Sequence, residues 1–568
     1  MRLIIVLFIC SSTYTIFSQE IKKEDLSKER KTYWDFTNNI LQSKGQYFKG
    51  EFGETNEKHG RWYYYNSYGE IEEVRDYYRD MLFGSVLLYY SNGQLRQEGY
   101  FKNNLQDSIY IEWYETGYLK VKGEFTKGKP TNKWYYYYSD GRLKSVEEIK
   151  EDRSSLLEFY LPDSVGTQTI INGEGELITY YTTGRVKEWY NYSEGLKNGD
   201  FEEFSPYGYH TLKGSFHSGL KNGCWEYFYY TGDKEKVTHY QDGILEGEYL
   251  YFYDNGKINV EGQFINGHKE GKWAWYTNKG GKDMVGEFRN GLQHGDWFYW
   301  YPNGERSYNA HYFDGLKTGE WVYYYQNGKK FKQGIFEKNI KDGKWMTWYE
   351  DGTTLMEGDY SKGKEDGVWK NYWNTGELKN TANFHDGKLQ GEWCSYHING
   401  KLKLKGQYEK DMKVGKWVEY FENGRLKELK HYKIFKEKSK LDYDLIKNRS
   451  IIFSKLHGPS TSYSSENYKI IEEGEYRQGE KDGKWTTYYP GGIPFVISNY
   501  KEGKLNGLMQ KFSRRGEITS EINYKEGLKN GTFILYGKSG KVIKKYNFKN
   551  GIKVDGGGLN DGGFSPKR

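Results

Sequence analysis

Large aromatic residues and glycines recur along this chain with a fixed spacing of 24 residues. We number each copy from its most frequent residue, a Trp, as position 0. The pattern occurs in 18 copies, and Trp fills position 0 in 11 of them. The longest block of copies begins at Leu177, Phe201, Trp225, Tyr249, Trp273, Trp297, Trp321, Trp345, Trp369, Trp393 and Trp417. A block before it begins at Trp62, Val86, Tyr110 and Trp134, and a block after it at Trp485, Met509 and Phe533.

Other positions in the repeat are stricter than position 0. Position 7 is Gly and position 3 is aromatic in all 18 copies. Position 15 is Phe or Tyr in 17 copies, with Ile149 as the exception, and Gly stands at position −2 in 16. A period of this length is the signature of a repeat architecture, in which each copy is one small supersecondary unit.

Each copy predicts a β-hairpin, because two stretches of seven to nine residues rich in aromatics are separated by turn residues. In the copy at Trp345, the first strand runs from Trp345, the turn contains Gly352, and the second strand runs from Leu355 to Tyr360. One hairpin is too small to be stable alone. We therefore predict an all-β fold: an elongated single-layer antiparallel meander of about 18 tandem 24-residue hairpins.

The turn after the first strand contains Pro at position 5 in three copies, at Pro206, Pro302 and Pro490. Pro cannot donate a ladder hydrogen bond, so it does not suit a two-residue type I′ turn at this position. It is favoured in a type I turn, which is commonly followed by a left-handed Gly bulge. We prefer this second turn.

The turn type also assigns residues to the two faces of the sheet, since side chains alternate along a strand. With one bulge, positions 3, 9, 13 and 15 share a face, which we expect to be the packed one. Position 0, position 4 and the Lys or Glu residues of the second strand then form a mixed, partly wet opposite face. A type I′ turn would exchange this assignment.

The spacing divides the chain into blocks. We expect a signal peptide at 1–18, an N-terminal segment with a degenerate cap at 19–59, and four repeats at 60–155. An insertion follows at 156–174, then 11 repeats at 175–435, a second insertion at 436–482 with a degenerate repeat near Ser460 to Gly479, and three repeats at 483–551. We favour loops flanking a hinge for the insertions. Residues 552–568 are rich in Gly and predict a flexible tail.

The first 18 residues have a positive start followed by an apolar run, which is typical of a secretory signal peptide. The run is shorter than a membrane-spanning helix requires. We therefore expect export to a periplasm, to a cell surface or to the medium. Cys224 and Cys394 remain after cleavage, seven copies apart. That separation is too large for a disulfide, so both are expected to be free thiols.

Composition and charge exclude several function classes. The formal net charge of +6 is small against 162 charged side chains, so the chain has no electrostatic footprint for nucleic acid. The 11 His are scattered, and there is no His-Glu-x-x-His or Cys-x-x-Cys motif. The Gly residues follow the 24-residue turn pattern, so they do not indicate a phosphate-binding loop. We expect no cofactor, no metal site and no catalytic residues. Asp-Gly and Asn-Gly pairs, which could suggest calcium loops, are explained as hairpin turns.

The Trp and Tyr side chains at positions 0 and 4 are the candidate binding face. Large rings give a one-layer sheet its contact area, so packing is the first interpretation. A groove of stacked rings between Lys and Glu would also suit peptides, glycans or lipid headgroups. The candidate residues are Trp273, Trp297, Trp321, Trp345, Trp369, Trp393, Trp417, Tyr301, Tyr325, Tyr349 and Trp373.

The segments Gly343 to Gly352 and Gly415 to Gly424 follow the pattern Gly-Lys-Trp-x-x-aromatic-aromatic-x-x-Gly. This pattern resembles the MORN repeat, in the variant found in YwqK-like antitoxins, over about residues 60–551. The resemblance implies a non-enzymatic binding or scaffold role. MORN repeats are associated with phospholipid contact and protein assembly, and YwqK-like proteins with neutralising a partner toxin.

Two hypotheses from different classes follow. The first is an exported scaffold that binds a protein partner, such as a toxin or an envelope protein. The second is a peripheral membrane or cell-surface scaffold that contacts lipid headgroups. An enzyme with a site assembled across neighbouring hairpins is a third alternative. Exposed end strands also suggest an oligomer formed by strand pairing.

Overall fold

The computed structural model describes residues 21–37, 39–151, 153–438 and 450–555. The expected signal peptide, residues 439–449 of the second insertion and most of the Gly-rich tail lie outside these residues. The described chain contains 47 β-strands and one 3-10 turn, η1 (Lys23–Asp25), and no α-helix. It divides into two compact units, Met1–His268 and Lys269–Arg568.

The first unit is a row of antiparallel strands in which each strand pairs with the next one in the sequence. These strands are β1 (Arg30–Tyr33), β2 (Leu41–Gly50), β3 (Gly53–Tyr65), β4 (Ile71–Tyr78), β5 (Met81–Tyr89), β6 (Leu95–Lys102), β7 (Leu105–Trp113), β8 (Leu119–Thr126), β9 (Lys129–Tyr137), β10 (Leu143–Lys150), β11 (Arg153–Tyr160), β12 (Gln168–Ile171), β13 (Glu174–Tyr180), β14 (Val186–Ser193), β15 (Leu196–Phe204), β16 (His210–His217), β17 (Leu220–Phe228), β18 (Lys234–Gln241), β19 (Ile244–Phe252) and β20 (Ile258–Ile265).

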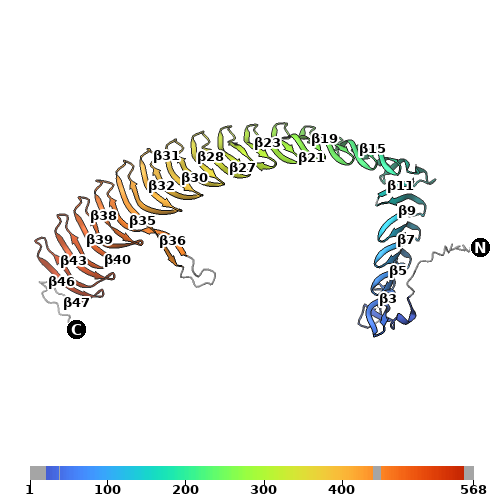
Figure 1. Ribbon diagram of the computed structural model, residues 1–568, viewed down its shortest axis with the longest axis horizontal. Coiled ribbons are helices and arrows are strands. Elements are labelled where there is room, and N and C mark those ends of the chain that lie inside the picture. Colours follow the sequence, from blue (N-terminus) through green and yellow to red (C-terminus); the bar gives the residue numbers. More distant parts are fainter. Residues whose placement is uncertain (1–20, 38, 152, 439–449, 556–568) are drawn as a thin grey trace, which may run out of the picture. The chain divides into compact units, whose positions relative to one another are not determined.

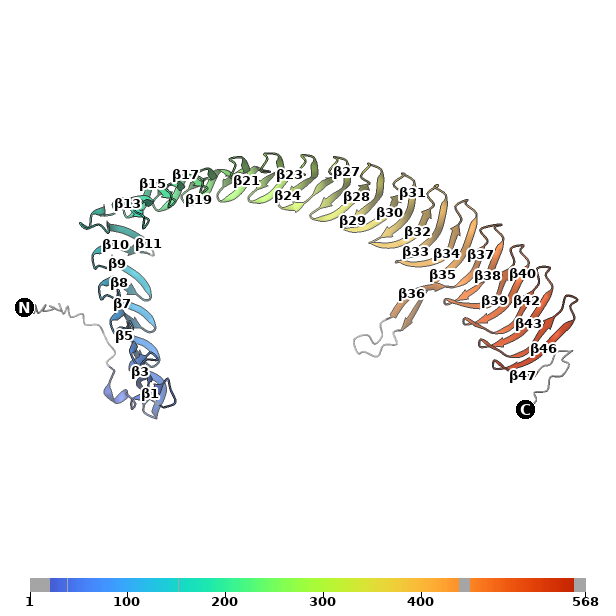
Figure 2. The ribbon, with the colours of Figure 1, turned by 180° about the vertical axis from the view of Figure 1, so that it is seen from behind.

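The second unit repeats this arrangement (Figures 1 and 2). Its strands are β21 (His268–Tyr276), β22 (Lys282–Arg289), β23 (Leu292–Trp300), β24 (Arg306–Phe313), β25 (Leu316–Lys317), β26 (Gly319–Tyr324), β27 (Lys330–Glu337), β28 (Ile340–Trp348), β29 (Thr354–Ser361), β30 (Lys364–Tyr372), β31 (Leu378–His385), β32 (Lys388–Tyr396), β33 (Leu402–Glu409), β34 (Met412–Tyr420), β35 (Leu426–Lys438), β36 (Ser450–Leu456), β37 (Gly458–Tyr463), β38 (Ile470–Arg477), β39 (Glu480–Tyr488), β40 (Pro494–Lys501), β41 (Lys504–Leu505), β42 (Gly507–Phe512), β43 (Ile518–Lys525), β44 (Leu528–Lys529), β45 (Gly531–Tyr536), β46 (Val542–Lys549) and β47 (Ile552–Asp555). The predicted meander of tandem hairpins is confirmed in both units.

The two ends of each hairpin use different turns. After the first strand of the Trp345 repeat, the Gly352 amide donates to the Tyr349 carbonyl at 2.9 Å, and Gly352 has a φ of +95°. This is the predicted type I turn with a left-handed Gly bulge. The connection to the next repeat is a two-residue type I′ turn, since Lys362 and Gly363 both have positive φ and Ser361 pairs with Lys364.

The predicted assignment of the faces is wrong, because each hairpin contains a second bulge. In the Trp345 repeat, Thr347 pairs with Met356 while Trp348 pairs with Thr354, so Leu355 at position 10 has no partner. One extra residue moves the rest of the second strand to the other face. Trp345 is therefore opposite Gly358 at position 13, on the face that also carries the aromatic residue at position 15.

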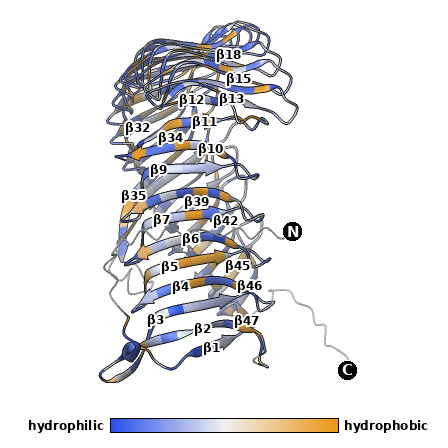
Figure 3. Cartoon of the chain, turned by 90° about the vertical axis from the view of Figure 1, so that its right-hand side faces the viewer, coloured by the Kyte–Doolittle hydropathy of each residue, from blue (hydrophilic) through white to orange (hydrophobic). Residues whose placement is uncertain are grey.

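We call this side the tryptophan face; it carries positions 0, 2, 4, 11, 13 and 15. The other side, with positions −1, 1, 3, 9, 12 and 14, is the open face. Ten position-0 Trp residues are at most 6% exposed, whereas the position-3 rings of the same repeats, Tyr65 apart, are only half-buried. The largest buried side chains therefore lie on the tryptophan face, whereas smaller ones such as Val322 and Cys394 are buried on the open face. In Figure 3, hydrophobic and hydrophilic residues are intermixed along strands such as β4, β6 and β34.

Both insertions contain strands where we expected loops. In the first, β11 and β12 form a short extra hairpin that pairs on both sides with the row. In the second, β37 and β38 are the degenerate repeat, with Ser460 in the place of Trp and opposite Gly474. The remainder of the second insertion lengthens β35 and adds β36.

Candidate functional site

The tryptophan face is built from a contact between a Trp ring and a Gly that recurs in at least eight repeats. The Trp345 ring lies over Gly334, at position 13 of the preceding repeat, and a Cβ on Gly334 would be 2.0 Å from the ring. The strand carrying Trp345 bulges at Gly343, whose φ is +60°, and this places the ring across its neighbour. The indole N–H donates to the carbonyl of Ile335 at 3.2 Å. Gly at position 13 therefore allows the close approach of the ring, and Gly at position −2 suits the positive φ of the backbone.

The Trp ring is also contacted by neighbouring aromatic rings and by a lysine. Phe336 and Tyr360, the position-15 rings of successive repeats, meet Trp345 edge-on at 5.2 and 5.8 Å between centroids. The Lys341 ammonium lies 4.8 Å from the centre of the Trp345 ring. The same lysine contact recurs at Lys269, Lys317 and other repeats. Burial lowers the pKa of Lys269, as expected for an ammonium covered by rings.

The position-4 tyrosines connect one hairpin turn to the next. The hydroxyls of Tyr301 and Tyr325 each donate at 2.8 Å to the carbonyl at position 3 of the following repeat. Tyr349 makes the same bond to the Tyr372 carbonyl at 3.0 Å. These hydroxyls therefore supply hydrogen bonds to backbone carbonyls beside the type I turns of the sheet.

The eleven predicted binding residues lie together on the tryptophan face, but mostly inside it. Trp273, Trp297, Trp321, Trp345, Trp369 and Trp417 are at most 5% exposed. Trp393 is half-buried, as is Trp373, over which Lys379 lies at 4.5 Å. Binding at these residues stays a prediction; the contacts above give the buried rings and the three tyrosines a packing role.

The open face carries a second row of aromatic side chains, at position 3, which the sequence pattern placed in the interior. Trp300, Tyr324, Trp348 and Tyr372 are half-buried at position 3 of successive repeats. The Arg306 guanidinium lies 4.2 Å from the centre of the Trp300 ring. The signal was present in the sequence as the invariant aromatic at position 3, but the bulge at position 10 concealed which face it occupies.

Charged groups on the open face are paired across strands. Glu357 accepts a hydrogen bond from the Tyr372 hydroxyl at 2.8 Å and forms ion pairs with Lys344 at 3.1 Å and Lys370 at 3.5 Å. The bond to Tyr372 and the two lysines hold the pKa of Glu357 below its usual value. Burial and the Glu357 carboxylate raise the pKa of Tyr372 to about 12. The open face therefore combines aromatic rings with fixed ion pairs.

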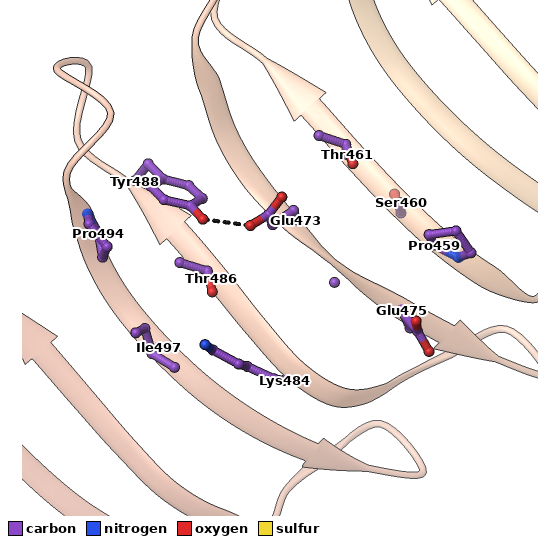
Figure 4. Close-up of a pocket in the computed structure, with 11 residues that line it drawn as sticks. Pro459, Ser460, Thr461, Glu473, Glu475, Lys484, Thr486, Tyr488, Pro494 and Ile497 are labelled. Carbon is purple, nitrogen blue, oxygen red and sulfur yellow. Dashed lines mark hydrogen bonds between the residues drawn. The ribbon is translucent and has the colours of Figure 1, made fainter.

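Several hollows lie where the repeat is interrupted. One of about 640 Å³ adjoins the first insertion and is lined by residues that include Tyr136, Phe159 and Leu177. Another of about 370 Å³ lies on the open face beside the Ser460 repeat (Figure 4). There the Tyr488 hydroxyl donates to Glu473 at 2.5 Å, and Lys484 and two prolines complete the rim. Within the described ranges, no group of three or more His, Cys, Asp or Glu side chains is placed to hold a metal ion.

The two cysteines form no disulfide: Cys224 is exposed and Cys394 is buried. This confirms the sequence prediction. Burial raises the pKa of both thiols. In the part of the chain that the structure covers, no helix is long and apolar enough to cross a membrane.

Comparison with known proteins identifies the repeat. A model described as a MORN repeat variant matches residues 84–103, 245–266, 317–338, 365–386, 389–410, 413–433 and 481–502. At these seven places the chain is similar to the MORN repeat variant. No curated protein matches the sequence.

Among solved structures, the chain is similar to a crystal structure of TcdB2-TccC3-Cdc42, with 12% identity and a TM-score of 0.12. The match covers 92% of this chain and 32% of that one. A second similar structure, TcdB2-TccC3, has 11% identity, a TM-score of 0.10, and coverage of 95% and 32%. The chain therefore spans about a third of these proteins.

Proposed function

We propose that this chain is an exported, non-enzymatic scaffold that binds a protein partner along the open face of its repeats. The observation that carries the proposal is the row of half-buried aromatic side chains at position 3, flanked by Arg, Lys and Glu. Tyr, Trp and Arg are the residues that contribute most to binding at protein interfaces. A row of repeats offers a long partner many such contacts.

Exposed aliphatic side chains extend the same surface. Ile335 and Val368, at positions 14 and −1, are 43% and 48% exposed. These aliphatic residues and the position-3 rings lie on either side of the ion pairs around Glu357 along the strands. Apolar and aromatic contacts together with hydrogen-bonding groups are common at protein interfaces.

The proposed partner is a toxin or an envelope protein, and a toxin would make the chain antitoxin-like. The support is the resemblance of the repeats to those of YwqK-like antitoxins. A toxin encoded beside this chain would be the first candidate. Co-expression with that toxin should restore growth if the chain neutralises it.

The direct test is capture of partners from an envelope extract. The native chain is compared with an Ile335→Asp/Val368→Asp variant and with a Leu292→Asp control. The Leu292 side chain is 50% exposed at the loop edge, the edge of the sheet where two-residue turns join successive repeats. We expect the open-face variant to retain at least ~10-fold less of any partner, because a carboxylate would be buried in an apolar contact. The control should bind like the native chain. If the native chain retains no protein, the proposal fails.

The second candidate is a peripheral scaffold that contacts lipid headgroups. Exposed aliphatic residues recur at position −5 along the loop edge, at Leu220, Ile244, Leu292 and Ile340. Flotation with anionic vesicles separates the two functions. Binding to vesicles without any protein present, abolished by Leu292→Asp but not by the open-face variant, would favour the membrane role.

A further inference from the structure

One connection in the second unit is unlike the others. Where neighbouring repeats are joined by a two-residue turn, the Trp417 repeat continues β35 to Lys438 and returns through β36. The two strands pair from Tyr432 with Leu456 to Lys438 with Ser450. We call residues 433–438 and 450–455 the arm. It leaves the row of strands in both views (Figures 1 and 2).

The arm is a two-stranded ribbon with an open edge. Among the described residues, β36 has ladder pairs with β35 alone. Its base is fixed because the Ser454 hydroxyl donates to the carbonyl of Lys413. Phe435 and Phe453 stack on one side of the ribbon, 6.2 Å apart. A two-stranded ribbon is marginal by itself and gains stability when further strands are added.

The open edge carries the sequence Ser-Ile-Ile-Phe-Ser, residues 450–454, without a charge or a proline. Ile451 and Ile452 are 49% and 52% exposed. Edges of this kind are templates for pairing with another strand, and proteins usually protect them with charges or prolines. Nothing in these five residues does so.

The same five residues are nearly symmetric about Ile452. We propose that two copies of this chain dimerise by antiparallel pairing of their β36 strands about a two-fold axis at Ile452. Ile452 then faces its counterpart, Ile451 faces Phe453, and Ser450 faces Ser454. Aromatic residues opposite β-branched ones are favourable cross-strand pairs. The contact is isologous, as in most dimers, and it joins two ribbons into one four-stranded sheet.

The ends of the chain are less suited to pairing than the arm. Near the N-terminus, Leu26 bridges to Phe48 and the Ser27 amide donates to the Tyr47 carbonyl at 2.9 Å, so part of the β2 edge is occupied. β47 is only four residues long. Pairing through the end strands stays a prediction, and the arm offers the longer uncharged edge.

Charge on the arm sets the conditions for the dimer. Its exposed charged residues are Lys433, Lys436 and Lys455 against Glu437. Two arms therefore repel one another weakly through solvent, and salt screens this repulsion. The dimer should tighten as ionic strength rises, which distinguishes it from an association held by ion pairs.

Sedimentation equilibrium of the full chain tests the proposal independently of the proposed function. We expect a concentration-dependent dimer, weakened at least ~100-fold in Ile452→Lys, because two ammoniums would face each other at the axis. Ile340→Lys, at a residue that is 49% exposed, is the control and should dimerise like the native chain. A variant with residues 434–454 replaced by Asn-Gly restores the ordinary connection and should be monomeric.

A cysteine at the axis gives a positive signal. In a Cys224→Ser background, Ile452→Cys should form a covalent dimer on mild oxidation, because directly opposed residues lie within disulfide range. A native chain that is monomeric at every concentration would overturn the proposal. So would a dimer that persists in both Ile452→Lys and the variant without the arm.

Discussion

At the scale of single residues, the packing of the Trp rings depends on the absence of a side chain in the neighbouring strand as much as on the size of the ring. The Trp345 ring is buried because Gly334 lets it lie directly on the neighbouring backbone. Position 13, which lies under the Trp ring of the next repeat, is occupied by Ala at Ala310 and Ala382. This position therefore tolerates a methyl group where the ring can shift. Trp321, above Ala310, is still 2% exposed, whereas Trp393, above Ala382, is half-buried.

Adding a methyl group at position 13 should lower the local stability of the repeat. Gly334→Ala places a Cβ 2.0 Å from the Trp345 ring, so the ring must move. We expect a local destabilisation of about 1–3 kcal/mol, typical of overpacking. Hydrogen exchange of β27 and β28 measures it. The control is Gly491→Ala, where no atom lies within 4 Å and φ is not positive; it should be neutral or stabilise by about 0.4–1 kcal/mol.

The tyrosine at position 4 should behave as a structural residue. Tyr349→Phe removes the hydroxyl that donates to the Tyr372 carbonyl. We expect a loss of about 0.5–1.5 kcal/mol in the exchange stability of the adjoining turns. Tyr207→Phe, at a side chain that is 79% exposed, should have no effect. Equal effects of the two changes would contradict the role of the hydroxyl as a link between turns.

At the scale of the hairpin, the sequence predicts the period, the strands and the turn. The invariant Gly at position 7 and Pro302 at position 5 indicate a type I turn, which the structure confirms. The second bulge could not be predicted, because position 10 has no characteristic residue: it is Asp283, Ser307 and Leu355 in three repeats. One unpaired residue reverses the faces, so the candidate binding face was assigned to the side that packs.

The structure of the insertions could not be predicted from the sequence for a related reason. Leu156 and Phe159 lie in a stretch that does not keep the spacing, so period alone predicts a loop there. The stretch nevertheless pairs with its neighbours on both sides, since an unpaired strand edge inside a row would leave backbone groups unsatisfied. Edge pairing therefore decides the structure where periodicity is lost.

Deleting one whole repeat should leave the fold intact. Removing residues 343–366 joins Asp342 to Gly367 and keeps every position in register. Each repeat contacts mainly its neighbours, so the repeats on either side of the deletion can pair with each other. Circular dichroism and limited proteolysis should match those of the native chain.

The matched control removes residues 343–365, one residue fewer. A shift of one residue would turn the position-0 side chain of the following strand to the other face. We expect local unfolding there and rapid cleavage by protease. If both deletions fold equally well, the register described above does not determine the packing.

At the scale of the whole chain, many phenols are held away from water. Burial raises the pKa of Tyr110 and Tyr192 to about 12, from an ordinary value of 10.0. The folded chain thus binds these protons more tightly than the unfolded chain does. Their contribution to stability is complete below about pH 10 and is lost as the pH rises toward 12.

An alkaline titration followed by tyrosinate absorbance checks this sign. Phenols in water ionise near pH 10. The buried phenols should ionise later, together with loss of the β-sheet signal. Tyr192→Phe should remove absorbance from the late step. A single step near pH 10 with the sheet intact would show that the phenols are not buried.

Residue-resolved hydroxyl-radical footprinting of the native chain tests the central claim most directly, because it reads every Trp separately. The claim is that the position-0 rings form the interior and the position-3 rings form the accessible surface. We expect Trp273, Trp297 and Trp345 to be labelled much more slowly than Trp300, Trp348 and the exposed Trp34. Labelling of the position-0 rings as fast as that of Trp300 and Trp348 would contradict the account.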